Sequence, residues 1–161
     1  MLHTPRSCWV IVASAVLALA ACARQSENKI PRVSKAILEQ ADQFQLLSLD
    51  PVYQVKAVKD DFYGYKVLGT TLVKDAETRK KLVSAFERGV AENQGIMAAC
   101  FNPRHGIHVT RGGKTADFVI CFECDQVSVH GDVQGHFLIT GSPQPVFDRA
   151  LLNANVPLGR R

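Results

Sequence analysis

The dipeptide Gly112-Gly113 is the feature that most constrains the fold, because it separates two β-rich runs, 107–111 and 115–121. A two-residue hairpin turn of this kind needs positive φ angles, which glycine adopts without steric cost. Counting outward from the turn places His108 opposite Asp117 on the neighbouring strand. The sequence therefore predicts an antiparallel hairpin with a defined register.

Further elements are predicted on both sides of this hairpin. Upstream, the pattern predicts a short helix over 34–43, strands over 44–49 and 63–73, and a helix capped by the carboxylate of Asp75. Downstream, it predicts a third strand over 125–130, a fourth over 136–140, and a helix from Pro143 to about Asn153.

The order of the main elements, β-β-α-β-β-β-α, predicts an α+β fold, a small antiparallel sheet with helices packed on one face. The helix after Asp75 carries an apolar stripe that includes Leu82 and Phe86, and this stripe is expected to face the sheet. The basic run Arg79-Lys80-Lys81 is expected to lie on a solvated helix face. Residues 32–161 suffice for one domain with a core.

The N-terminus indicates where the chain goes. An apolar run from Cys8 to Ala23 follows Arg6 and ends at Arg24. This run is shorter than the roughly 20 apolar residues that span a bilayer as a helix. A charged start, an apolar middle and small residues at the end are typical of a secretory signal peptide, with an uncleaved membrane anchor as the alternative.

The end of the run, Leu19-Ala20-Ala21-Cys22, resembles the lipobox of bacterial lipoproteins. The resemblance covers the first two dozen residues only. It implies a signal peptide over 1–21, a Cys22 thiol that carries diacylglycerol, and a lipidated N-terminus with a polar tether over 22–31. Several acyl chains suffice for stable membrane anchoring. The alternative is cleavage nearby, with Cys22 as an ordinary thiol.

This resemblance also implies a location, the extracytoplasmic side of the cell envelope. Ala23 rather than aspartate follows Cys22, which in the family favours the outer membrane of a bacterium with two membranes. Removing residues 1–21 takes away only Arg6, so the formal net charge falls from +4 to +3. The aromatic and basic interleaving of single-strand binders is absent. With an anchor outside the cytoplasm, we therefore expect no nucleic acid as a partner, and expect an envelope protein or ligand instead.

Three cysteines remain for the domain, Cys100, Cys121 and Cys124, once Cys8 leaves with the signal peptide and Cys22 takes lipid. Thiols outside the cytoplasm usually form disulfides. A redox role for the Cys-Phe-Glu-Cys stretch is disfavoured because its first cysteine follows a strand and not the start of a helix.

A zinc site is the second hypothesis for these cysteines. Cys100, His105, Cys121 and Cys124 have the right ligand chemistry. Cys121 and Cys124 would, however, point to opposite faces of a regular strand. We therefore expect no cofactor, with zinc as the alternative.

A structural disulfide is the favoured hypothesis. Extending the hairpin register places Cys121 opposite Arg104 and Cys124 opposite Phe101, so either cysteine lies near Cys100. Strand parity places Cys124 on the core face as a buried thiol. The expected bridge is then Cys100–Cys121.

The stretch "ACFNPRH", 99–105, together with "VICFEC", 119–124, resembles an uncharacterised family of bacterial secreted or lipid-anchored proteins with a CFxPRH…CFxC pattern. The stretches "FYGYKVLGTT" and "SPQPVFDRALL" fit the same resemblance. It covers most of the expected mature chain and implies one compact domain. It implies no activity.

Candidate catalytic groups are few. Arg104-His105 beside Cys100 is the best nucleophile and base combination, but an oxidising compartment opposes a free thiolate. His130 and His136 flank a glycine turn as a candidate metal pair. G-x-S-x-G, H-E-x-x-H and phosphate-binding glycine motifs are absent from the sequence. No catalytic residue is assigned, and the expected function is a non-catalytic binding or structural role.

Overall fold

The computed structural model describes residues 29–55 and 59–160. The predicted signal peptide and Cys22 lie outside these residues. The elements are α1 (Arg32–Glu39), β1 (Gln43–Tyr53), β2 (Asp61–Phe62), β3 (Tyr65–Leu72), α2 (Ala76–Glu92), β4 (His105–Arg111), β5 (Lys114–Cys121), β6 (Gln126–Gly131), β7 (Gly135–Leu138) and α3 (Gln144–Asn153).

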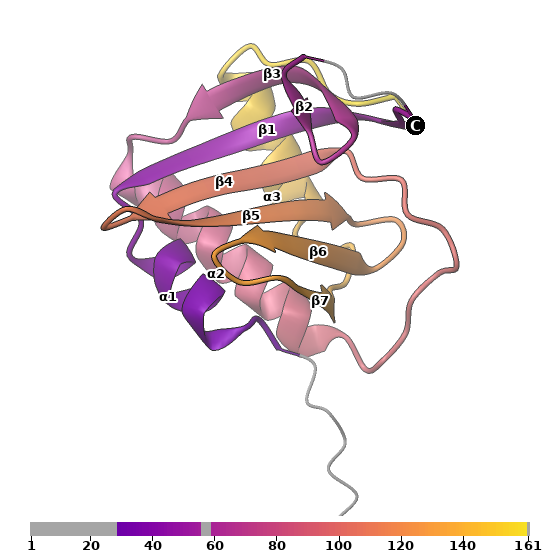
Figure 1. The fold of residues 1–161 in the computed structure, drawn as a ribbon, viewed down its shortest axis with the longest axis horizontal. Helices are drawn as coiled ribbons and strands as arrows, with labels where there is room; N and C mark the ends of the chain where they lie inside the picture. The colour runs from indigo at the N-terminus through magenta and orange to yellow at the C-terminus, as the bar shows by residue number, and fades with distance from the viewer. Residues whose placement is uncertain (1–28, 56–58, 161) are drawn as a thin grey trace, which may run out of the picture.

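The seven strands form one antiparallel sheet in the order β2-β3-β1-β4-β5-β6-β7. The three helices lie behind this sheet in the view of Figure 1, so one face is covered by helices. The predicted α+β fold is confirmed. The prediction missed the short strand β2. The predicted element order β-β-α-β-β-β-α has three strands after the first helix, whereas the structure has four strands after α2, namely β4, β5, β6 and β7.

Strand β1 continues through Asp50-Pro51, where the sequence predicted its end. The register of β1 against β3 shifts between Leu49 and Tyr53. Proline cannot donate to a ladder and is tolerated where pairing is irregular. Pro51 therefore interrupts the ladder without ending the strand.

The hairpin register is confirmed. Arg111 pairs with Lys114 and His108 with Asp117, and Gly112 and Gly113 adopt φ angles of 54° and 79°. The predicted cap of α2 is also present, because Asp75 Oδ2 accepts a hydrogen bond of 2.7 Å from the Thr78 amide. Hydrogen bonds from Thr78 hold the pKa of the Asp75 carboxyl below its usual value.

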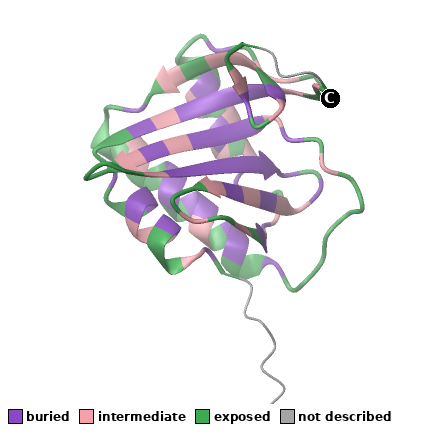
Figure 2. Cartoon of the chain, in the orientation of Figure 1, coloured by how far each residue is buried: buried purple, intermediate pink, exposed green. Residues whose placement is uncertain are grey.

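The main core lies between the sheet and the helices. The α2 stripe is buried as predicted, and Phe86 is fully buried at its centre. The Phe86 ring lies 5.5 Å from Phe118, 5.9 Å from Phe137 and 6.2 Å from Phe147, measured between centroids. Buried residues recur along the central strands and on the inner sides of the helices (Figure 2).

A smaller apolar cluster occupies part of the opposite face. It consists of Leu47, Leu49, Phe62, Tyr65 and Val119. The Phe62 ring packs against Gly106, where an added Cβ would lie 2.9 Å from a ring carbon. The β2–β3 hairpin thus folds over this face (Figure 1), and glycine at 106 leaves room for it.

Candidate functional site

The cysteines pair differently from the prediction. Cys121 is bonded to Cys124, with their Cα atoms 5.2 Å apart, and the expected Cys100–Cys121 bridge is wrong. Strand β5 ends at Cys121, and the chain then turns through Asp125, whose φ of 56° is left-handed. The alternation that separates neighbouring side chains in a strand does not apply in a turn. Cys124 is therefore buried as half of a disulfide and not as a free thiol.

The third cysteine lies against this bond. Cys100 is exposed, and its thiol donates to Cys124 Sγ over 2.9 Å. The loop that carries Cys100, 94–104, is attached to the turn by backbone contacts. The Ala98 amide donates to the Cys124 carbonyl over 3.1 Å, and the Asn102 amide donates to Cys124 Sγ over 3.4 Å.

His105 does not join the sulfur cluster, which contradicts the predicted zinc ligand set. Its Nε2 lies 2.7 Å from Asp148 Oδ1 on α3, and its ring is packed against Phe122 and Phe147. Strand β4 presents His105 to the helix-covered side, where it is almost fully buried. Within the described residues, no group of three or more His, Cys, Asp or Glu side chains is arranged to hold a metal ion.

The predicted nucleophile and base combination is not assembled either. The Arg104 guanidinium lies 2.7 Å from Glu123 Oε2, and it also donates to the Arg160 carbonyl. The His105 ring is bound to Asp148 on α3 and not to the Cys100 thiol, so it is not placed as a base for Cys100. Arg104 therefore fixes the Cys-Phe-Glu-Cys turn by its ion pair with Glu123.

A polar cluster forms on the face of the sheet opposite the helices. Its members, named here the Asp117 cluster, are Tyr63, His108, Asp117, Ser128 and His130. The buried Asp117 carboxylate binds His108 Nδ1 at 2.5 Å and accepts from the Tyr63 hydroxyl at 2.6 Å. The Tyr63 ring stacks on His130 at 3.9 Å, and His130 Nε2 lies 3.0 Å from Ser128 Oγ. The predicted His108–Asp117 pair is thus present as part of a larger network.

The protonation of this cluster suits a structural role. Burial, and then the hydrogen bond to Asp117, raise the pKa of Tyr63 well above its usual value, so the phenol remains a donor. Burial lowers the pKa of His130. Tyr63 also adopts a left-handed φ of 56°. The cluster therefore holds a strained turn between β2 and β3 against the sheet.

His136 is separate from this cluster. Its Nε2 lies 3.1 Å from Gln126 Oε1, whereas His130 is bound to Ser128. The two histidines therefore have different partners and do not form the metal pair that the sequence suggested.

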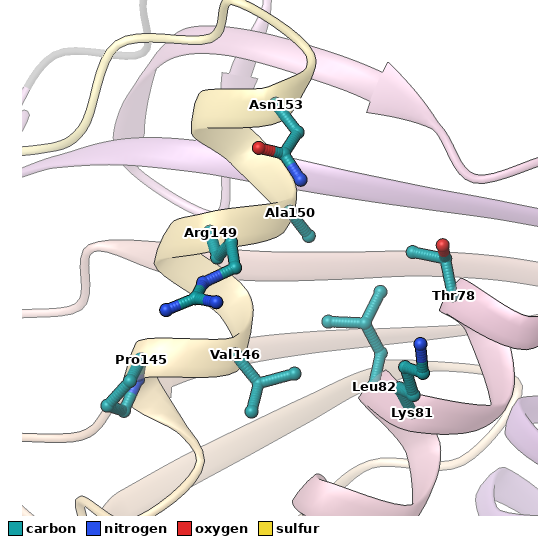
Figure 3. Close-up of a pocket in the computed structure, with 8 residues that line it drawn as sticks. All are labelled: Thr78, Lys81, Leu82, Pro145, Val146, Arg149, Ala150 and Asn153. Carbon is teal, nitrogen blue, oxygen red and sulfur yellow. The ribbon is translucent and has the colours of Figure 1, made fainter.

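A cleft of about 370 Å³ lies between α2 and α3. Its apolar part consists of Leu82, Val146 and Ala150, which point into the space between the helices in Figure 3. Lys81 lines the cleft from α2, and Arg149 lines it from α3 with its guanidinium directed away from α2 (Figure 3). Such a volume lies at the lower end of the range of small-ligand sites.

The remaining residues that line the cleft include no acidic side chain. Thr78 and Asn153 lie at one end and Pro145 at the other. The two cations that line the cleft therefore have no carboxylate among the other lining residues. This arrangement suits an anionic group that is attached to a short apolar chain.

The structure corrects the expectation for Arg79 alone in the run Arg79-Lys80-Lys81. Arg79 donates to the Ala41 carbonyl at 2.7 Å and to the Val73 carbonyl at 3.3 Å, so it is not a solvated side chain. Lys80 and Lys81 are both exposed, as predicted. Lys81 lines the cleft, and the helical spacing of Thr78, Lys81 and Leu82 was the available sequence signal.

Comparisons with known proteins add little to this geometry. No protein-family model matches the chain, and no curated protein matches it. A solved structure from Clostridium perfringens, of a protein proposed to be a lipoprotein, matches with a TM-score of 0.40 and 9% identity, over 75% of this chain and 92% of that one. A likeness this distant carries no functional argument. Among the described residues, no helix is long and apolar enough to cross a membrane.

Proposed function

We propose that the chain is a lipid-anchored envelope protein with a non-catalytic role, which binds a small anionic amphiphile in the α2–α3 cleft. The observation that carries the binding role is the cleft itself, where Lys81 and Arg149 flank the apolar surface of Leu82, Val146 and Ala150. The anchor is supported by the sequence, through Leu19-Ala20-Ala21-Cys22.

The chemistry of the cleft selects a carboxylate or phosphate on a hydrocarbon chain. Arg149 offers a planar guanidinium that matches such oxygens, and Lys81 adds a second positive charge. Burying the chain against the apolar surface contributes about 25 cal/mol per Å² of apolar area removed from water. Charge alone or hydrocarbon alone would satisfy only part of the site.

A lipid anchor at Cys22 places the domain beside a source of such ligands. Fatty acids and single-chain phospholipids leave the bilayer more readily than lipids with two chains, because each buried methylene contributes about 0.8 kcal/mol to membrane binding. In a bacterium with two membranes we propose attachment to the outer membrane, on the basis of Ala23 at the position after Cys22. In this proposal Cys121–Cys124 stabilises the turn between β5 and β6.

The test uses an octanoate probe that carries a photoreactive diazirine, with the full chain in lipid nanodiscs. We expect cross-links on α2 and α3, reduced about tenfold or more by Lys81→Glu with Arg149→Glu, because charged hydrogen bonds are lost. The matched control, Lys80→Glu with Arg88→Glu, reverses two exposed charges of α2 outside the cleft and should preserve labelling.

Two further experiments test the anion requirement of the cleft and the lipid anchor separately. The corresponding diazirine-octanol should label the wild-type cleft weakly, since it lacks the anion. Equal labelling of both double variants by the octanoate probe would refute the assigned site. Independently, Cys22→Ala should abolish the acyl mass on the N-terminal peptide, and an unlipidated wild-type peptide would refute the anchor.

A further inference from the structure

We propose that Cys100, Cys121 and Cys124 form a thiol–disulfide exchange site, in which Cys100 is the exposed sulfur that connects a buried disulfide to thiols of other molecules. This goes beyond the proposed ligand binding and does not depend on the cleft. It rests on the contact of 2.9 Å between the Cys100 thiol and Cys124 Sγ.

The exposure of the three sulfurs differs sharply. Cys121 is 1% exposed and Cys124 is 0% exposed, whereas Cys100 is an exposed residue. An external thiolate can attack a disulfide only where it can reach a sulfur atom. The buried bond is therefore shielded from solvent, and Cys100 is the accessible sulfur of the cluster.

Hydrogen bonds to the loop hold Cys100 beside Cys124. Gln126 Nε2 donates to the Ala98 carbonyl at 2.6 Å and to the Cys100 carbonyl at 2.9 Å, so one β6 side chain clamps both ends of a three-residue segment. The Ala98 amide also binds the Cys124 carbonyl. These bonds fix the backbone on both sides of the contact, and the position of the thiol follows from them.

The turn that carries the disulfide is held as well. The ion pair between Arg104 and Glu123 joins the end of the loop to the centre of the turn. The Asn102 amide donates to Cys124 Sγ at 3.4 Å, which favours negative charge on that sulfur during exchange. The same sulfur is therefore contacted by a thiol and by a hydrogen-bond donor.

The first step is redox-neutral. The Cys100 thiolate attacks Cys124 Sγ, a bond forms between Cys100 and Cys124, and the bond between Cys124 and Cys121 breaks. The electron pair leaves with Cys121 Sγ, which takes up a proton. One disulfide and one thiol are present before and after this step.

The exchange exposes the disulfide to other molecules. In the Cys100–Cys124 form, a thiolate of a second molecule attacks Cys100 Sγ, forms a mixed disulfide and releases the Cys124 thiolate. A second thiol of that class then attacks the mixed disulfide and frees Cys100. The external dithiol or thiol pair is oxidised to a disulfide, and Cys121 with Cys124 is reduced by the same two electrons.

The exchanged form can be trapped in the full chain. Cys121→Ser, equilibrated with reduced and oxidised glutathione and mapped by mass spectrometry after acid quench and alkylation, should contain a Cys100–Cys124 disulfide. The matched variant Cys124→Ser removes the central sulfur and should leave Cys100 and Cys121 alkylatable after unfolding. Two free thiols in Cys121→Ser would overturn the proposal.

The role of Cys100 is tested by kinetics in the folded protein. With reduced glutathione as the probe, Cys100→Ser should slow reduction of the Cys121–Cys124 disulfide by about tenfold or more, because access to a buried sulfur is lost. An unchanged midpoint of thermal unfolding in oxidised Cys100→Ser excludes a folding defect as the cause. If the variant is reduced at the wild-type rate, Cys100 is not the connecting sulfur.

Discussion

The two faces of the sheet achieve order by different means. The helix-covered face is packed with aromatic and aliphatic side chains around Phe86, and its core residues are almost completely buried. The opposite face combines a small apolar cluster with the Asp117 cluster, whose hydrogen bonds hold the β2–β3 hairpin. The hydrophobic effect stabilises a core without requiring a particular orientation of its side chains, whereas a hydrogen bond requires a defined distance and angle between two groups. The first face is thus expected to set global stability and the second to set local structure.

The largest expected effect is on the helix-covered face. Phe86→Ala removes a fully buried ring that contacts Phe118, Phe137 and Phe147, so the free energy of unfolding should fall by about 3–5 kcal/mol. Urea denaturation measures this change. The control Leu152→Ala alters an exposed leucine of α3 and should change stability by no more than about 0.5 kcal/mol. A loss below about 1.5 kcal/mol for Phe86→Ala would contradict this account of the core.

A smaller and more local effect is expected on the opposite face. Asp117→Asn removes the charge that binds both Tyr63 and His108, and it should lower stability by about 1.5–3 kcal/mol. Hydrogen exchange should accelerate at the amides of β2 and β3 more than at those of β5, because the hairpin loses its attachment. Asp132→Asn, at an exposed carboxylate that binds Thr115, is the matched control. If hydrogen exchange accelerates equally at the amides of all strands, the Asp117 cluster stabilises the whole sheet and not the β2–β3 hairpin alone.

The smallest effect is a dependence on pH. Burial lowers the pKa of His130 below its ordinary 6.5, so the unfolded chain takes up a proton more readily than the folded one. The contribution of neutral His130 is therefore fully present above pH 6.5 and is lost as the pH falls through the lower folded pKa. His130→Phe keeps a ring beneath Tyr63 and removes the titration.

Denaturation midpoints at several pH values between 8 and 5 test this difference. Wild-type stability should fall more steeply toward pH 5 than that of His130→Phe, because only the wild-type imidazole must be protonated against burial. If stability falls equally with pH in the two proteins, the titration of His130 does not contribute to the pH dependence of stability.

Local chemistry predicted the parts of the fold that depend on neighbouring residues. Gly112-Gly113 specified a turn and with it the pairing of His108 with Asp117, because the register of a tight hairpin is set at the turn. The apolar stripe of α2 was also recognisable from the helical repeat, and its Asp75 cap from a carboxylate placed before the free amides of the first turn. The lipid anchor stays a prediction of a different kind, because it is implied by the resemblance of Leu19-Ala20-Ala21-Cys22 to a lipobox.

Longer-range associations depended on the tertiary structure. Tyr63 binds Asp117 across 54 positions, and only the folding of the β2–β3 hairpin over the sheet brings them together. The disulfide was mispredicted because the alternation of a strand was carried past Cys121, where the chain turns. His105 had acceptable zinc-ligand chemistry in sequence, but the pleat of β4 directs it to Asp148.

The cleft shows the same division. The sequence by itself predicted two helices, one that carries Lys81 and one that spans the position of Arg149. Only the tertiary structure decided that these two residues line one cleft, because helix packing is set by the fit of whole surfaces. The helical or strand repeat in the sequence assigns a residue to one face of its own helix or strand. Which residues that face contacts depends on how the sheet and the helices pack together.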